Sequence, residues 1–216
     1  FLSETTHDGM DICLLSAAFS KSKYKAVIEN YFNKIAKQDN LTSLNTAFAK
    51  EGAYINIPKN VEVEKPIQII YFTTGSYEAT MLQPRNLIVV EENSHVQIIE
   101  RYQSLTNNDV LTNSVTEIFV NRHATVDLYK IQNDKDSASL VDNTFIEQKS
   151  DSVCSVHTFS FGGKITRNNL NFFQRGEHID SILKGITIIE GKQHVDHNTL
   201  VHHIEPNSES HQDYKG

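Results

Sequence analysis

The chain has 216 residues, of which 38% are hydrophobic and 22% are charged, and its formal net charge is −7. These proportions are typical of a soluble globular protein and exclude a disordered chain. The acidic balance argues against a nucleic-acid partner, because contact with a phosphate backbone needs a basic face. No apolar run approaches the roughly 20 residues that cross a bilayer, so no membrane partner is expected either.

Two cysteines, Cys13 and Cys154, lie far apart in the sequence, and neither belongs to a C-x-x-C pair. This spacing excludes the zinc and iron–sulfur motifs that depend on grouped thiolates. The lack of a disulfide framework favours a reducing compartment, so we expect a cytoplasmic protein. The chain begins with Phe1 and ends at Gly216 inside a predicted strand or turn. We therefore expect an internal piece of a longer protein. Whether the true N-terminus carries a targeting segment does not follow from this sequence.

Short helices are predicted near the N-terminus. The apolar residues 12–15 form a segment that is too short to classify by periodicity. Over residues 24–35, apolar side chains recur at i, i+3, i+4 and i+7, which predicts an amphipathic helix. Asp39 or Asn40 is placed to cap a second short helix over residues 41–48. We expect these helices to pack on the edge of a sheet.

Strands dominate the rest of the chain, so we expect residues 1–51 to pack on a β-core formed by residues 52–216. After a turn at residues 58–60, apolar and polar residues alternate over 61–71, as in a half-buried strand. After Pro84 one strand follows another with few glycines or prolines between them. The predicted strands cover residues 87–91, 96–102, 114–120, 125–132, 140–147, 153–161, 169–174, 178–190 and 194–203.

A loose repeat connects these strands. An apolar strand, a short polar turn and a new alternating strand follow one another at residues 90–98 and 120–128, and again around 176–179 and 191–195. The turns are separated by about 16 to 28 residues or simple multiples, the spacing of stacked repeat units. Neither Asn-Gly nor Asp-Gly hairpin turns occur between the strands. We therefore predict a mainly β fold of stacked β-coils, with an antiparallel sandwich as the alternative.

Sequence motifs for catalysis and phosphate binding are incomplete or absent. Phe161-Gly162-Gly163-Lys164 lacks the first glycine and the hydroxyl residue of a P-loop, so a turn between coils is predicted. Neither a Ser-His-Asp order nor an H-E-x-x-H motif occurs. The adjacent acids Glu91 and Glu92 point to opposite faces of a strand. We assign no catalytic or cofactor-binding residue and expect that the chain is not an enzyme.

Ten histidines occur, and five of them lie near the C-terminal end. In a strand, His197 and His203 share the more apolar, inward face, whereas His194 and His202 share the other. Six residues of strand span about 20 Å, so His197 and His203 cannot chelate one ion without a bend. We expect hydrogen-bonded packing residues and keep His197 and His203 only as weak metal candidates.

Four motifs stand out in the C-terminal part of the chain. They are Arg167-Asn168-Asn169-Leu170-Asn171-Phe172, Gly176-Glu177-His178, Gln193-His194-Val195-Asp196-His197-Asn198-Thr199 and Tyr214-Lys215-Gly216. Together they resemble the SufB/SufD family of iron–sulfur cluster assembly proteins. Shorter matches at residues 57–59 and 84–90 extend the resemblance from about Leu41 to the end. The third and fourth motifs look more like SufD than SufB.

The resemblance implies a right-handed parallel β-helix flanked by helical segments. It also implies a cytosolic complex with a SufB-like subunit and a SufC-like ATPase, in which this chain is a non-catalytic scaffold. An iron–sulfur cluster would be assembled transiently by the full complex, and none would be bound by this chain alone. The family's Cys/His segment and its SufC-binding helices would lie beyond Gly216. Cys13 and Cys154 match no family motif. The formation of a homodimer is kept as an alternative.

Two other classes of protein share the predicted fold. A β-helical carbohydrate-active enzyme would be secreted and would carry clustered acids and exposed aromatics on one face, and the sequence shows no such cluster. A homo-oligomeric structural module would use its end coils as association surfaces.

Overall fold

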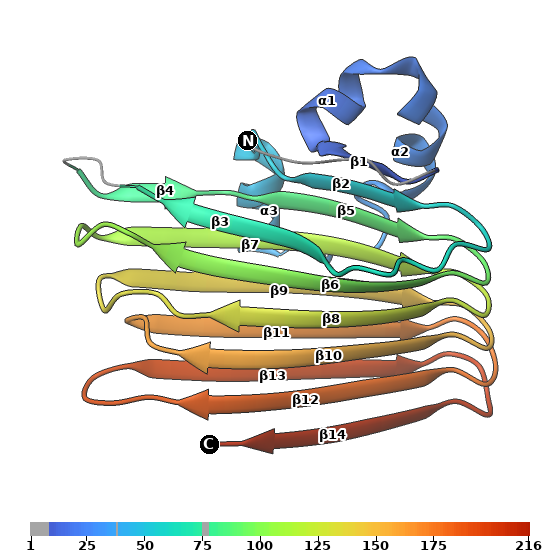
Figure 1. Ribbon diagram of the computed structural model, residues 1–216. Coiled ribbons are helices and arrows are strands. Elements are labelled where there is room, and N and C mark those ends of the chain that lie inside the picture. Colours follow the sequence, from blue (N-terminus) through green and yellow to red (C-terminus); the bar gives the residue numbers. More distant parts are fainter. Residues whose placement is uncertain (1–8, 38, 75–77) are drawn as a thin grey trace.

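The computed structural model describes residues 9–37, 39–74 and 78–216, which form a right-handed parallel β-solenoid with helices at its N-terminal end (Figure 1). Each coil contributes one strand to each of two facing sheets. The eight-stranded sheet contains, in spatial order, β1 (Asp11–Leu14), β2 (Ala53–Ile57), β5 (Arg85–Val90), β7 (Val110–Val120), β9 (Ala138–Gln148), β11 (Ile165–Gln174) and β13 (His194–His203), with β4 (Thr80–Leu82) also paired to β7. The six-stranded sheet contains β14 (Glu209–Lys215), β12 (Asp180–Ile188), β10 (Val153–Phe161), β8 (Thr125–Gln132), β6 (His95–Ser104) and β3 (Ile67–Thr73).

The winding of the chain follows from the strand directions. In Figure 1 the strands of the rear sheet run to the right, those of the front sheet run to the left, and the chain descends from coil to coil. Within the described ranges, β1 and β2 form the one antiparallel pair among the strands. Tyr54 pairs with Leu87 and Ser139 with Ile165, so a coil takes about 26 to 33 residues, as in other solenoids. The prediction of stacked β-coils is confirmed, and the antiparallel sandwich is excluded.

Alternate residues of each strand fill the space between the sheets. In β6 and β8, Val96, Ile98, Val126 and Leu128 point inward and are buried. The register aligns Val96 with Val126 and Ile98 with Leu128, so apolar rows run from coil to coil. Each such side chain contributes about 1.5 to 3 kcal/mol when it is removed from water. The apolar interior therefore holds neighbouring coils together.

One corner of the solenoid repeats a left-handed backbone conformation. It lies where the chain passes from the eight-stranded to the six-stranded sheet, and its members have φ between 57° and 60°: Asn60, Asn93, His123, Asp151, His178 and Asn207. Each of the first five donates its N–H to a carbonyl of the following coil, as His123 does to Ser150 at 3.2 Å. Asn, Asp and His adopt this conformation more readily than most residues. The corner therefore sets a turn for every coil.

Part of the predicted sequence repeat coincides with this corner. The predicted turns at 90–98, 120–128 and 176–179 contain its residues Asn93, His123 and His178. The predicted turn at 191–195 lies instead at the opposite end of the coils, between β12 and β13. The corners at Asp151 and Asn207 were not predicted, although a serine follows each of them, as it follows Asn93.

The helices precede the solenoid in the sequence and are α1 (Leu15–Ser20), the 3-10 turn η1 (Ser22–Tyr24), α2 (Lys25–Tyr31) and α3 (Asn40–Phe48). Both predicted helices are confirmed, although α2 ends at Tyr31. Asp39 caps α3, because its Oδ1 accepts the N–H of Thr42 at 2.8 Å. Residues 12–15, which periodicity left unclassified, form most of β1 and the start of α1. No helix in these ranges has the length and apolar character needed to span a bilayer.

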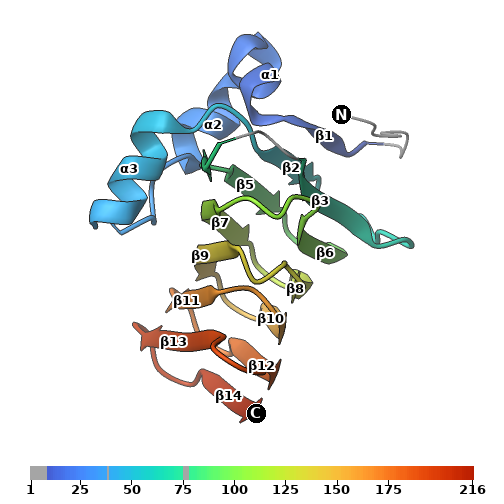
Figure 2. The same cartoon turned by 90° about the vertical axis from the view of Figure 1, so that its left-hand side faces the viewer.

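The helices cover more than the sheet edge, so that prediction was too narrow (Figure 2). A cluster joins α1, η1 and α2 to the outward side chains of β2, β5 and β7. Its buried members are Leu15, Ala18, Tyr24, Ile28, Tyr54, Leu87, Val89 and Phe119. An apolar outer face of a sheet has to be covered, and here the N-terminal helices cover it.

Several strands begin earlier than predicted, among them β7 and β11 by four residues each, and two strands begin later for local reasons. The predicted strand over residues 61–71 begins only at Ile67, because Pro66 has no N–H to donate. The strand expected from residue 178 begins at Asp180, since His178 occupies the corner. β4 was not predicted as a strand, and only the last residues of β14 were expected to lie in a strand or turn. The first has three residues and the second is rich in charged side chains, so neither shows apolar alternation.

A buried ion pair fastens the N-terminal segment to the solenoid. Arg85 Nη2 on β5 lies 2.6 Å from Glu117 Oε2 on β7, and neither side chain is exposed. Glu117 Oε2 also accepts the N–H of Asn33 at 2.7 Å, and Oε1 accepts those of Ile35 and Ala36 at 3.0 and 3.2 Å. Burial lowers the pKa of Arg85, and the charge of Glu117 opposes that shift. This Arg85–Glu117 clamp thus supplies acceptors to the backbone that follows α2.

A comparison of glycine with valine at position 151 separates the effect of the corner's backbone conformation from that of the Asp151 side chain. Both variants lose the 3.8 Å contact of Asp151 with His123. Glycine adopts a φ of 60° freely, whereas β-branched valine does not. We expect Asp151→Val to be less stable than Asp151→Gly by about 1 to 2 kcal/mol in urea unfolding. Equal stability of the two variants would show that the corner does not select its residues.

Removal of the Glu117 carboxylate tests the clamp. We expect Glu117→Ala to lower the free energy of unfolding by about 3 to 5 kcal/mol, because Arg85 is left buried and unpaired. Glu92→Ala is the matched control, since its pair with Lys59 is exposed on the same solenoid. The control should lose less than about 1 kcal/mol. Similar losses in both variants, measured in urea, would contradict a special role for Glu117.

Candidate functional site

Three ionisable side chains meet inside the solenoid, between its two sheets. Lys130 Nζ on β8 lies 2.7 Å from Glu100 Oε2 on β6 and 2.8 Å from Asp142 Oδ2 on β9. All three residues are buried. Glu100 and Lys130 are register partners in the six-stranded sheet, and Asp142 faces them from the eight-stranded sheet. These residues are called the inner charge cluster.

Hydroxyl groups complete the bonding of the inner charge cluster. Lys130 Nζ donates to Thr144 Oγ1 at 2.7 Å, so the ammonium group has three oxygen acceptors. Tyr102 OH donates to Glu100 Oε1 at 2.6 Å and lies 2.8 Å from Ser114 Oγ. Burial raises the pKa of Tyr102 well above its ordinary value, and the Glu100 charge adds to the rise. The phenol therefore stays protonated and available as a donor.

Asn86 extends the network toward the first coils. Its Nδ2 donates to Glu100 Oε1 at 3.3 Å and to Thr116 Oγ1 at 3.0 Å. Its Oδ1 accepts the phenol of Tyr71 at 2.6 Å. The network thus connects β3, β5, β6, β7, β8 and β9 through side chains alone.

The electrostatics of the cluster are unbalanced. One ammonium group faces two carboxyl groups, so full ionisation leaves a net negative charge away from water. Burial raises the pKa of Asp142 to about 6; the charge of Lys130 opposes the rise, and that of Glu100 adds to it. Burial alone would lower the pKa of Lys130, but Asp142 and Glu100 raise it overall. Lys130 therefore stays charged, and Asp142 takes up a proton more readily than an exposed aspartate.

The bonding within the inner charge cluster suits a structural role, in which it holds neighbouring strands in position. A buried polar network whose members bond one another fixes the structure around it. Because the cluster spans both sheets and adjacent coils, a shift of one coil would leave charges unpaired. Its buried side chains are enclosed by the solenoid, so a substrate does not reach them without opening the coils.

Sequence reasoning missed this cluster, although a signal was present. In β6 and β8 the inward positions run Val96, Ile98, Glu100 and Val126, Leu128, Lys130. The two charged residues therefore have the same parity as buried apolar ones. Asp142 carried no such signal, because its proximity depends on how the two sheets face each other.

The structure separates the two histidines that were kept as weak metal candidates. His197 faces the interior, where Nε2 lies 2.9 Å from Thr187 Oγ1 and Nδ1 lies 3.2 Å from Asn168 Nδ2. Burial lowers the pKa of His197, and Asp196 opposes that shift. His203 is exposed at the end of β13. In the part of the chain that the structure describes, no three His, Cys, Asp or Glu side chains are grouped to hold a metal ion.

Both cysteines are free thiols on separate strands. Cys154 lies in the apolar core, where burial raises its pKa and the Asp127 charge adds to the rise. Cys13 on β1 is half-buried, and burial is the main cause of its raised pKa. A raised pKa keeps a thiol protonated at neutral pH and therefore weakly reactive.

The glycine pair after β10 forms a turn between coils, as predicted. Gly162 and Gly163 have φ of 104° and 76°. Gly163 N–H donates to the carbonyl of Asp134 in the preceding coil at 3.0 Å, and a Cβ on Gly162 would lie 2.7 Å from the same oxygen. The glycines allow adjacent turns to approach closely.

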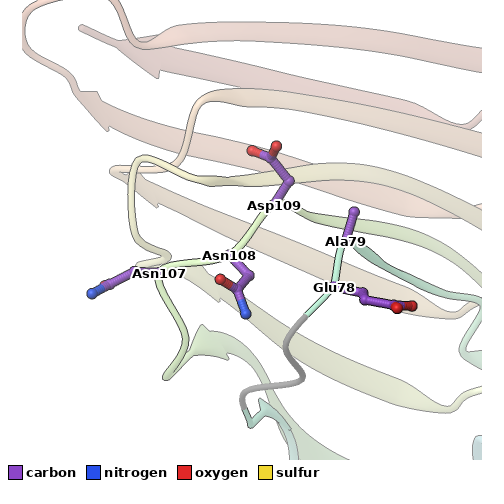
Figure 3. A pocket seen from close by; sticks show the side chains of 5 residues that line it. All are labelled: Glu78, Ala79, Asn107, Asn108 and Asp109. Carbon is purple, nitrogen blue, oxygen red and sulfur yellow. The ribbon is translucent and has the colours of Figure 1, made fainter.

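A hollow of about 310 Å³ lies at the end of the coils opposite the repeated corner. Glu78, Ala79, Asn107, Asn108 and Asp109 line it. Figure 3 shows that its polar side chains point in different directions. Oxygen ligands of a hard cation must converge at 2.0–2.6 Å from it, roughly. The hollow is therefore not arranged to bind a metal ion.

Variants at Lys130 and Asp142 test the charge balance of the inner cluster. We expect Lys130→Met to lose about 3 to 5 kcal/mol of stability at pH 8, because two carboxylates stay buried without a cation. Asp142→Asn keeps one ion pair and should lose much less. The folded state of the unmodified protein binds a proton on Asp142 below about pH 6, whereas the unfolded chain does so only nearer its ordinary pKa.

The pH dependence gives a second readout. The raised pKa contributes stability at low pH that is lost as the pH rises through about 6. The stability of the unmodified protein relative to Asp142→Asn should therefore increase as the pH falls from 7 to about 4.5. A pH-independent difference between the two proteins would contradict the assignment of this proton to Asp142.

Comparisons with known proteins match this architecture to one family. The model of the SufBD core domain of the SUF system for FeS cluster assembly matches residues 71–216, and that of the SufBD protein N-terminal region matches residues 3–69. The iron–sulfur cluster assembly SufBD family protein slr0076 of Synechocystis is 31% identical over 74% of this chain and 37% of its own length. The iron–sulfur cluster assembly protein SufD of Bacillus subtilis is 27% identical over 87% of this chain and 44% of its own length.

The matched stretch spans less than half the length of these relatives. The iron–sulfur cluster assembly protein SufB of Bacillus subtilis also aligns, at 26% identity over 84% of this chain. The family models together cover the helices and the solenoid, in the same order as the structure has them. The chain therefore belongs to the SufBD family.

Proposed function

We propose that this protein is a scaffold subunit of a Suf-type iron–sulfur cluster assembly complex and is not a catalyst by itself. The observation that carries the proposal is the match of both SufBD family models to one helical segment and its solenoid. Relatives named SufD and SufB are iron–sulfur cluster assembly proteins by name, and each aligns with more than four fifths of the chain. A stack of parallel coils presents long faces and edges to partner proteins.

The arrangement of polar side chains supports the non-catalytic part of the proposal. Lys130 has three oxygen acceptors inside the solenoid, and both ring nitrogens of His197 have partners. The polar residues around the hollow of Figure 3 diverge. Catalytic groups need mutual geometry around a reachable point.

The proposed partners are a SufB-like subunit and a SufC-like ATPase in the cytoplasm. The iron–sulfur cluster is then the cargo of the whole complex. Cluster ligation needs grouped thiolates. Cys13 and Cys154 lie on β1 and β10, and burial raises the pKa of both thiols. The chain by itself is thus poorly equipped to hold a cluster, which agrees with a scaffold that acts only in a complex.

Co-purification of the full-length protein tests the proposal. We expect a tagged protein to retain a SufB-like and a SufC-like subunit from the same organism in fixed ratio when the three are co-expressed. Co-expression with each subunit alone identifies the direct contact. A protein that stays monodisperse and elutes without either subunit would overturn the scaffold proposal. Cleavage of an acidic polysaccharide would favour the enzyme alternative instead.

A further inference from the structure

β3 is the terminal strand of the six-stranded sheet, at the end away from β14 (Figures 1 and 2). Its strand neighbour is β6, to which it is parallel. Among residues 9–37, 39–74 and 78–216, no strand pairs with its other edge. This edge is called the β3 edge.

The hydrogen-bonding groups at the β3 edge follow from the parallel register. In a parallel pair, the N–H and the C=O of one residue both bond the same neighbouring strand. The N–H and C=O of the next residue point to the opposite edge. Thr73 C=O accepts the N–H of Leu105, which follows β6, at 2.8 Å. The N–H and C=O groups of Ile69, Tyr71 and Thr73 therefore face β6. The N–H and C=O groups of Gln68, Ile70 and Phe72 face the β3 edge.

The side chains at this edge do nothing to block pairing. Ile70 is 41% exposed and Phe72 is 56% exposed, and β3 contains no charged residue. Natural edge strands usually carry a charge, a proline or a bulge that prevents association. The uncharged β3 edge therefore lacks the side chains that usually prevent association.

We propose that the β3 edge is a self-association surface on which β3 of a second copy pairs in antiparallel orientation. A twofold axis at Ile70 makes Ile70 face Ile70 of the second copy as a hydrogen-bonded pair. Gln68 of each copy then faces Phe72 of the other, again as a hydrogen-bonded pair. In antiparallel ladders such pairs recur at every second residue, which matches the spacing of the free groups. All three N–H groups and all three C=O groups of each edge are satisfied.

A second copy fits this edge better than an arbitrary strand. The free groups are symmetric about Ile70, and a twofold interface requires such self-complementarity. No like charges face each other across the axis, because β3 has none. The outward side chains form an apolar Ile70–Ile70 contact flanked by the aromatic ring of Phe72, and such cross-strand pairs stabilise a sheet. One strand pair makes a small interface, so the dimer dissociates on dilution.

Lysine substitutions on one sheet face give a matched test. Ile70→Lys places two ammonium groups against each other at the axis, whereas Ile186→Lys puts the same change on β12, which is paired on both edges. The two isoleucines are similarly exposed, at 41% and 43%. By sedimentation equilibrium of the purified protein alone, we expect the parent and Ile186→Lys to dimerise. Ile70→Lys should dissociate at least about tenfold more readily.

A crosslinking experiment tests the axis itself and does not depend on the lysine variant folding well. Ile70→Cys should form a covalent dimer with a short bismaleimide, while Ile186→Cys and the parent, with its two natural thiols, should not. A monomeric parent at every concentration up to its solubility limit would overturn the proposal. So would a dimer that survives Ile70→Lys unchanged, or equal crosslinking at positions 70 and 186.

Discussion

The rest of the structure depends on the in-register stacking of parallel coils. Once Ser139 pairs with Ile165, every later inward position of β9 and β11 is aligned, since the side-chain period of a strand is two. A one-residue slip would turn the interior of a coil outward. The repeated corner at residues such as Asn93 and His123 protects against this slip, because it starts each second-sheet strand from the same backbone conformation. Apolar rows then reward the correct register along the whole stack.

The stacking also explains how the chain tolerates charges in its interior. An isolated buried carboxylate is strongly destabilising, whereas one held between neighbouring coils finds partners at fixed distances. Glu100 and Lys130 occupy the same register level, so the ladder that aligns Ile98 with Leu128 also aligns the ion pair. The Arg85–Glu117 clamp applies the same principle on the outer face of the other sheet. It converts a carboxylate into the acceptor for three backbone N–H groups that follow α2. The inner charge cluster and the Arg85–Glu117 clamp therefore fix the register of the coils as well as stabilising the fold.

The sequence predicts the repeating parts of this structure and misses the parts that depend on facing surfaces. Alternation locates most strands after Pro84, and four of the predicted turns contain corner residues. Pro66 shortens the run before β3 for a reason that is also local. In contrast, the partner of Lys130 on β9 follows only from the distance and offset between the sheets. Charged residues usually face water, so parity alone does not make Glu100 a buried residue. The same holds for the inward His197, whose shared parity with the exposed His203 shows that a strand can leave the interior near its end.

A protein with this architecture meets its partners through faces and edges, because the stacked coils leave little room for a deep pocket. The charge pattern along those edges then decides what can bind. β14, for comparison, carries the charged Glu209, Asp213 and Lys215 among its exposed residues. β3 carries none, and its free groups are symmetric about Ile70. The uncharged edge of β3 therefore favours an uncharged strand, and we propose its own copy as that strand.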